Sequence, residues 1–134
     1  MRTGLVVREY LRPHCRLCLR RRHTSNPYNF IRRGYACLKC SRKKQGWAWS
    51  LDLKELYAVY DSQEGRCALS GEVMTYQSTD NNENDSNISL DRIDGDKGYE
   101  NGNIQLVCKR INLMRHTATV KDFKQWCTKV SENR

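Results

Sequence analysis

The sequence predicts an α+β protein in two parts, a small cysteine-rich ribbon or knuckle module at residues 1–46 and a β-β-α core with flanking helices at 47–134. Two Cys-x-x-Cys pairs stand close together in the first part. In the second part, the short apolar runs 88–93 and 103–107 predict two strands, and a helical pattern follows at 108–116. A hairpin and a helix in this order give the core its predicted class.

Two further helices flank this core. The first starts after Asp52, which has capping-box spacing to Glu55, and it ends before Gly65. Its core-facing positions recur at helical intervals and are Leu53, Leu56, Tyr57 and Tyr60. Between this helix and the hairpin, the polar segment 75–87 predicts a surface loop.

The last helix starts near Thr119, with Asp122 at the reciprocal capping position. It carries an apolar stripe that we expect to be buried, formed by Phe123, Trp126, Cys127 and Val130. We also expect Met114, on the helix before it, to lie in the core.

Composition limits the size of the core and indicates the cellular compartment. The 134 residues are 38% hydrophobic, so the apolar core must be modest. A core of this size benefits from a stabilising cross-link, such as a bound metal or a disulfide. The longest apolar run near the start, Leu5-Val6-Val7, is too short for a signal peptide or a membrane span. Seven cysteines, an odd number, favour metal binding in a reducing compartment over disulfides. We therefore expect a soluble, cytoplasmic protein that does not bind membranes.

The basic charge is concentrated at the start of the chain. Residues 1–50 hold 13 Lys and Arg against one acid, Glu9, whereas the whole chain has a net charge of +9. We expect this region to contact the phosphates of a nucleic acid, and the alternative is a solvated basic surface without a ligand.

The two Cys-x-x-Cys pairs predict one structural Zn²⁺. Cys15-x-x-Cys18 and Cys37-x-x-Cys40 are separated by 18 residues, which suits four thiolates around one tetrahedral ion. Pro27 is expected to mark a turn inside this module, as is Gly34. Zinc would supply about 10 kcal/mol or more of folding free energy to a region with little core of its own.

A second pair of knuckles is incomplete, because Cys67 is followed at knuckle spacing by Ser70 and Cys108 by Ile111. Isoleucine cannot bind a metal, so we predict no second zinc. We expect Cys67 and Cys108 to pack as small buried residues.

Asp91 and Asn112 predict a second, catalytic ion. A carboxylate on a strand and an amide on the adjoining helix offer the oxygen ligands that a hard divalent ion favours, and they leave positions for a phosphate and water. Arg115 and His116 follow Asn112 by three and four residues. If the helix continues, all three share one face.

The segment 89–115 and the cysteine pairs before it resemble the HNH, or ββα-metal, endonucleases. The matching residues are Asp91-Arg92, Gly98-Tyr99, Asn103 and Asn112, and the variant with Asp-Arg in place of Asp-His occurs in phage-encoded and rare-cutting restriction enzymes. This resemblance implies Mg²⁺ or Mn²⁺ bound by Asp91 and Asn112. It also implies that Asn103 pins the hairpin loop and that Arg115 stabilises charge on the phosphate or leaving group.

Arg92 departs from the usual family pattern. Arginine, with a pKa above about 12, cannot deprotonate water at neutral pH, so Arg92 can only clamp a phosphate or stabilise negative charge. Tyr60 is the first candidate for activating the nucleophile, because arginine-variant relatives use a tyrosine, and a core role is the alternative. His116 is the second candidate, either as the base or as a third metal ligand. We expect Tyr99 to shape the loop.

The predicted partner is double-stranded DNA. Trp47 could stack or wedge at the bases, although helix packing is the commoner role of tryptophan. Cleavage of both strands would need two active sites and hence a homodimer, but the sequence pattern does not indicate a dimer interface. The predicted DNA contacts are Arg20, Arg21, Arg22, Arg32, Arg33, Arg42, Lys43, Lys44 and Trp47.

Three functions are consistent with these patterns. We expect a metal-dependent DNA endonuclease, a homing or restriction-like phage enzyme that works in the host cytoplasm. The alternatives are a catalytically silent zinc-ribbon protein that binds nucleic acid, and an RNA-binding or ribosome-associated zinc protein. The pair Asp91 and Asn112 favours the first, because a protein that only binds has no need of it.

Overall fold

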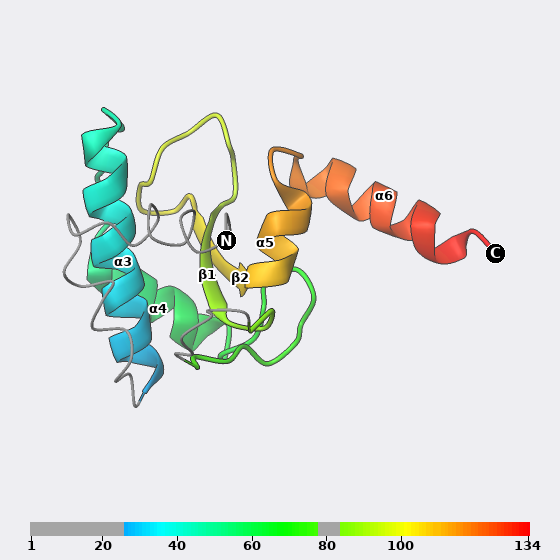
Figure 1. Cartoon of the computed structure of the whole chain (residues 1–134), viewed down its shortest axis with the longest axis horizontal. Coiled ribbons are helices and arrows are strands. Elements are labelled where there is room, and N and C mark those ends of the chain that lie inside the picture. The colour runs from blue at the N-terminus through cyan, green and yellow to red at the C-terminus, as the bar shows by residue number, and fades with distance from the viewer. Residues whose placement is uncertain (1–25, 78–83) are drawn as a thin grey trace, which may run out of the picture.

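The computed structural model describes residues 26–77 and 84–134. These residues form four helices and one antiparallel two-stranded sheet (Figure 1). The predicted α+β class is therefore confirmed, and so is the order strand, strand, helix. In chain order the elements are α3 (Pro27–Lys44), α4 (Leu53–Ser62), β1 (Ile88–Arg92), β2 (Ile104–Cys108), α5 (Lys109–Arg115) and α6 (Val120–Glu132).

Helix α3 corrects the prediction of turns within residues 13–46. Asn26 caps the helix, since its side chain accepts a hydrogen bond from the backbone N–H of Asn29 at 2.8 Å. Pro27 is the first helical residue, where a missing N–H costs nothing, and Gly34 lies within the helix. Both residues were interpreted as turn formers because they lie between the two cysteine pairs, but the local capping favours a helix.

The core extends across the boundary predicted at residue 46. Phe30 and Ile31 of α3 are buried in the same cluster as Leu56 of α4 and Leu106 of β2. Helix α3 packs against α4 and β1, and α4 packs against β2. Residues on both sides of the predicted boundary therefore stabilise one another by burying apolar surface together.

The hairpin places Asp91 opposite Gln105, because β1 and β2 pair antiparallel in that register. Asn103 fixes the loop that joins the strands: its Nδ2 donates to the carbonyls of Asp94 (3.1 Å) and Gly98 (2.9 Å), and its Oδ1 accepts from the Asp94 N–H (2.9 Å). This is the geometry expected of a residue that pins the loop. Helix α5 follows β2 directly and packs on both strands.

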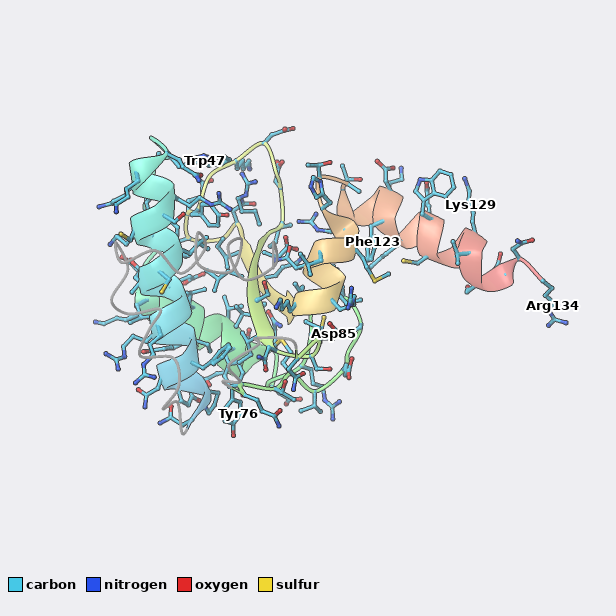
Figure 2. All side chains as sticks on the ribbon, in the orientation of Figure 1. Trp47, Tyr76, Asp85, Phe123, Lys129 and Arg134 are labelled. Atoms are coloured by element: carbon cyan, nitrogen blue, oxygen red, sulfur yellow. The ribbon has the colours of Figure 1, made fainter. Side chains whose placement is uncertain are left out.

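Helix α6 begins as predicted but does not bury its apolar stripe. Thr119 caps it by accepting a hydrogen bond from the Asp122 N–H at 3.1 Å. The helix extends away from the other elements (Figures 1 and 2), and Trp126 and Val130 are 63% and 73% exposed. Cys127 is exposed too, as is Met114 at 57%, so the prediction that these residues lie in the core was wrong. The stripe has helical periodicity, but the described residues offer no surface to cover it.

No helix in residues 26–77 or 84–134 combines the length and the apolar character that a bilayer crossing requires.

Candidate active site

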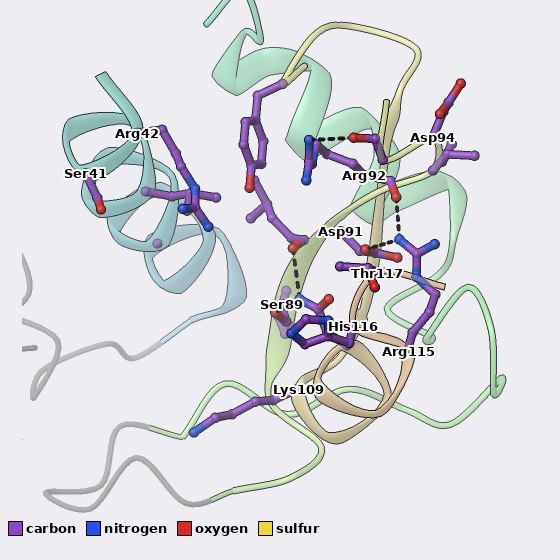
Figure 3. A pocket seen from close by; sticks show the side chains of 18 of the residues that line it. Ser41, Arg42, Ser89, Asp91, Arg92, Asp94, Lys109, Arg115, His116 and Thr117 are labelled. Carbon is purple, nitrogen blue, oxygen red and sulfur yellow. Dashed lines mark hydrogen bonds and ion pairs between the residues drawn. The ribbon is translucent and has the colours of Figure 1, made fainter. Parts of the chain in front are cut away.

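A cavity of about 1000 Å³ lies between α3 and the unit formed by β1 and α5 (Figure 3). Six of the residues predicted to act in catalysis or metal binding line it, which are the predicted zinc ligand Cys37 and the residues Asp91, Arg92, Asn112, Arg115 and His116. Figure 3 shows Asp91, Arg115 and His116 gathered where β1 meets the C-terminal end of α5. The structure thus brings to one cavity residues of α3, β1 and α5 that lie far apart in the sequence.

Asp91 is a buried carboxylate held on both oxygens. Its side chain is 5% exposed, and Oδ1 lies 2.5 Å from Nη2 of Arg115 while Oδ2 accepts from Nε2 of Gln105 at 2.9 Å. Gln105 reaches it because the two residues are opposite each other in the hairpin. The carboxylate is therefore held in one orientation, with a positive charge beside it.

Arg115 is the buried cation of the site. It is 5% exposed, and besides Asp91 it donates to the carbonyls of Arg92 (2.5 Å) and Ala118 (3.0 Å). Its guanidinium thus ties the end of β1 to the turn after α5, and its Nε is buried without a hydrogen-bond partner among the described residues. In this structure Arg115 positions Asp91 and also lines the cavity, and its role toward a phosphate stays a prediction.

Asn112 projects from α5 onto β1. Its Nδ2 donates to Oγ of Ser89 at 2.7 Å and to the carbonyl of Leu90 at 3.1 Å. Both amide protons are used by the residues that precede Asp91 on the strand. The amide is therefore fixed against the strand that carries the buried carboxylate. The Oδ1 of Asn112 has no hydrogen-bond partner within the part of the chain that the structure describes.

His116 lies outside the helix that was expected to contain it. Helix α5 ends at Arg115, and His116 adopts a positive φ of 48° as the C-cap, with its N–H donating to the Asn112 carbonyl at 3.1 Å. The helical spacing from Asn112, which predicted one shared helix face, therefore does not determine where the His116 side chain lies. It is exposed and nevertheless lines the cavity.

Arg92 is held by the loop and by aromatic rings. Its Nη1 donates to the carbonyls of Gly95 (3.0 Å) and Lys97 (3.1 Å). Its Cζ lies 4.7 Å from the ring centre of Trp47 and 5.3 Å from that of Tyr99. Tyr99 is buried and stacks on Trp49, so the prediction that it shapes this loop agrees with its position.

Tyr60 is not brought to the cavity. Tyr60 lies on α4 and packs edge-to-face against Tyr28 of α3, with ring centres 5.6 Å apart. Its hydroxyl lies beside Gly65. Burial raises the pKa of Tyr60, which makes the phenolate needed for base chemistry harder to form. The structure therefore favours the alternative role for Tyr60, a tyrosine in the helix packing.

Only half of the predicted zinc site lies in the described residues. Cys37 and Cys40 are on one face of α3, whereas Cys15 and Cys18 lie outside the described residues. Across residues 26–77 and 84–134, no three His, Cys, Asp or Glu side chains are placed to hold a metal together. The four-cysteine zinc site stays a prediction.

Cys67 and Cys108 meet away from this cavity, both nearly inaccessible to solvent as predicted. Cys67 Sγ accepts hydrogen bonds from the N–H groups of Ser70 (3.4 Å) and Cys108 (3.3 Å). Burial raises the pKa of Cys67, but these hydrogen bonds lower it and the net direction is downward. Burial and the neighbouring Cys67 raise the pKa of Cys108 to about 11.

The predicted DNA contacts follow one helix as far as the structure describes them. Arg20, Arg21 and Arg22 lie outside the described residues. The remaining basic residues are on α3, and Trp47 follows it with 40% of its surface exposed. Those on the helix are Arg32, Arg33, Arg42, Lys43 and Lys44.

Sequence reasoning missed Gln105 and Ser89, which orient the two proposed metal ligands. The register of the hairpin would have identified Gln105, because in antiparallel strands it is fixed once one pair is known.

Comparison with protein-family models, with curated proteins and with solved structures gave no significant match to this chain.

Proposed function

We propose that this chain is a metal-dependent DNA endonuclease of the HNH type that hydrolyses phosphodiester bonds. The observation that carries the proposal is the placement of Asp91 and Asn112, both fixed at the junction of β1 and α5 and both lining one cavity. A cavity on the basic side of the molecule, beside α3, could admit a DNA backbone.

The donor set fits a hard divalent ion such as Mg²⁺ or Mn²⁺. Asp91 supplies a carboxylate, and Asn112 offers an amide oxygen that no hydrogen bond occupies among the described residues. When bound, such an ion polarises the phosphoryl group and stabilises the leaving oxygen. Arg115 neutralises Asp91 without the ion, so we expect weak ion binding that a DNA phosphate strengthens by completing the ligand set.

The protein's own groups would do the rest of the work. His116 lines the cavity and is exposed, so it can take a proton from the attacking water and pass it to solvent. Arg92, a permanently cationic residue type, would clamp a phosphate of the DNA backbone. Tyr60 has no role in this scheme because its ring packs against Tyr28 of α3, outside the cavity.

Cleavage of supercoiled plasmid in Mg²⁺, Mn²⁺ or EDTA tests the proposal. We expect nicking that EDTA abolishes and that His116→Ala slows by about 10²-fold or more. Thr117→Ala is the matched control, since Thr117 is the next residue, is exposed and also lines the cavity. Equal cleavage by His116→Ala and Thr117→Ala would remove His116 as the base.

A catalytically silent DNA-binding protein is the second candidate. It is favoured by two observations: Arg92 stands where a base is expected, and both oxygens of Asp91 are already hydrogen-bonded within the protein. Binding of DNA without cleavage in any divalent ion would support this candidate over the nuclease.

A further inference from the structure

Two guanidinium groups contact the same pair of aromatic rings beside the cavity. Arg42 reaches in from α3 and Arg92 from the end of β1, and Figure 3 shows both at the same cavity. The Cζ of Arg42 is 5.7 Å from the ring centre of Trp47 and 5.9 Å from that of Tyr99, the same two rings that Arg92 contacts. Two positive charges therefore share one aromatic platform, formed by the rings of Trp47 and Tyr99.

Among the described residues, neither guanidinium has an acidic partner. Within residues 26–77 and 84–134, Arg42 donates Nη1 to the amide of Gln45 at 2.9 Å, and Arg92 donates Nη1 only to carbonyls. The Nε of Arg42 is buried with no hydrogen-bond partner in the same part of the chain. Two cations on one pair of rings and the unused buried donor of Arg42 both favour a bound anion at this end of the cavity.

Tyr99, one of the two rings of this platform, is firmly packed. Tyr99 stacks on Trp49 with ring centres 4.8 Å apart and an angle of 17°, and Trp49 donates its Nε1–H to the carbonyl of Leu51 at 3.1 Å. Tyr99 itself is buried. The guanidinium groups are thus oriented before a ligand arrives, which reduces the entropy lost on binding.

We propose that Arg42 and Arg92 form a second phosphate site, which takes a DNA phosphate next to the scissile one. Guanidinium forks match phosphate oxygens in pairs, and the site lines the same cavity as Asp91 and Asn112. The site deepens the proposed function, because a neighbouring phosphate held here would align the strand over the proposed metal ligands. Trp47 serves as the platform for the arginines and not as a wedge between bases.

The test is binding of a DNA duplex in EDTA as a function of KCl, by fluorescence anisotropy. We expect Arg42→Ala to reduce the slope of log Kd against log salt by about 0.9, the value for one lost phosphate contact. Arg66→Ala is the control with the same change in charge, since Arg66 is exposed and lies outside the cavity, and it should leave the slope unchanged. Circular dichroism of both variants monitors folding.

A duplex series with one neutral methylphosphonate at each position in turn gives the second readout. One position should weaken binding of the wild type several-fold and leave Arg42→Ala unaffected, because that variant no longer contacts the charge. Equal slopes for Arg42→Ala and wild type, or no binding even in low salt, would overturn the site. If the slope changes but the plasmid is never cut, the phosphate site stands and the nuclease proposal fails.

Discussion

Asp91 and Arg115 form the ion pair around which the candidate site is built. Both side chains are 5% exposed, and each makes further hydrogen bonds to the protein. A buried pair of this kind adds little net stability, but removing one partner leaves an uncompensated charge inside the protein. The pair is therefore better understood as a device that orients the carboxylate than as a source of stability.

Asp91→Asn should lower the free energy of unfolding by about 3 to 5 kcal/mol, because Arg115 would keep its charge without a counterion. Urea denaturation measures the loss. The double variant Asp91→Asn/Arg115→Met should recover part of it, since the stranded charge is gone. A single variant as stable as the wild type would show that the pair is open to water in solution.

At the scale of elements, the hairpin and the helix after it were the most predictable part. Strands expected at 88–93 and 103–107 are observed at Ile88–Arg92 and Ile104–Cys108, because short apolar runs bounded by Gly and Asp specify a hairpin locally. The placement of Asp91 and Asn112 on adjoining elements that line one cavity followed from this order. The residues around Asp91 were less predictable, since the register that selects Gln105 depends on tertiary pairing.

Other elements could not be predicted because a local pattern competed with a wider context. In α3, the cysteine spacing indicated a zinc module with turns, whereas the Asn26 cap and the buried apolar pair Phe30 and Ile31 favour a helix. At His116, the helical spacing from Asn112 was correct only up to the residue where the backbone leaves the helix. Periodicity identifies a helix, but it does not say where the helix stops or what covers it.

The contact between the end of β2 and the turn after α4 predicts a pH dependence. The pKa of Cys108 is raised to about 11, so between about pH 9 and 11 the unfolded chain releases this proton while the folded chain retains it. Stability from this group is present below pH 9 and is lost as the pH rises. Cys67, whose pKa is lowered, contributes in the opposite direction and offsets part of the loss.

Urea unfolding at pH 8 and pH 10.5 measures this effect. We expect the wild type to lose on the order of 2 kcal/mol more than Cys108→Ala between the two pH values. Cys127→Ala, which changes an exposed cysteine, should behave as the wild type does. Identical losses in wild type and Cys108→Ala would contradict the assignment.

At the scale of the whole molecule, stability is concentrated in one part. Leu56, Leu106 and Val107 are fully buried in a core that joins α3, α4 and the hairpin, whereas α6 projects from this core. The apolar stripe of α6 makes a ring contact at Trp126 with Lys129 of the same helix, at 4.5 Å, but it does not join the core cluster. Large side chains in these two regions should therefore differ sharply in their effect on folding.

Trp126→Ala should change the free energy of unfolding by less than about 0.5 kcal/mol, because the side chain is 63% exposed and little surface is lost from the core. Leu56→Ala, at 0% exposure, should cost about 2 to 5 kcal/mol through lost burial and a residual cavity. Urea denaturation at low protein concentration compares the two variants with the wild type. A loss above about 2 kcal/mol for Trp126→Ala would mean that the stripe is covered in solution, and repeating the measurement over a hundredfold range of concentration would show whether a second copy covers it.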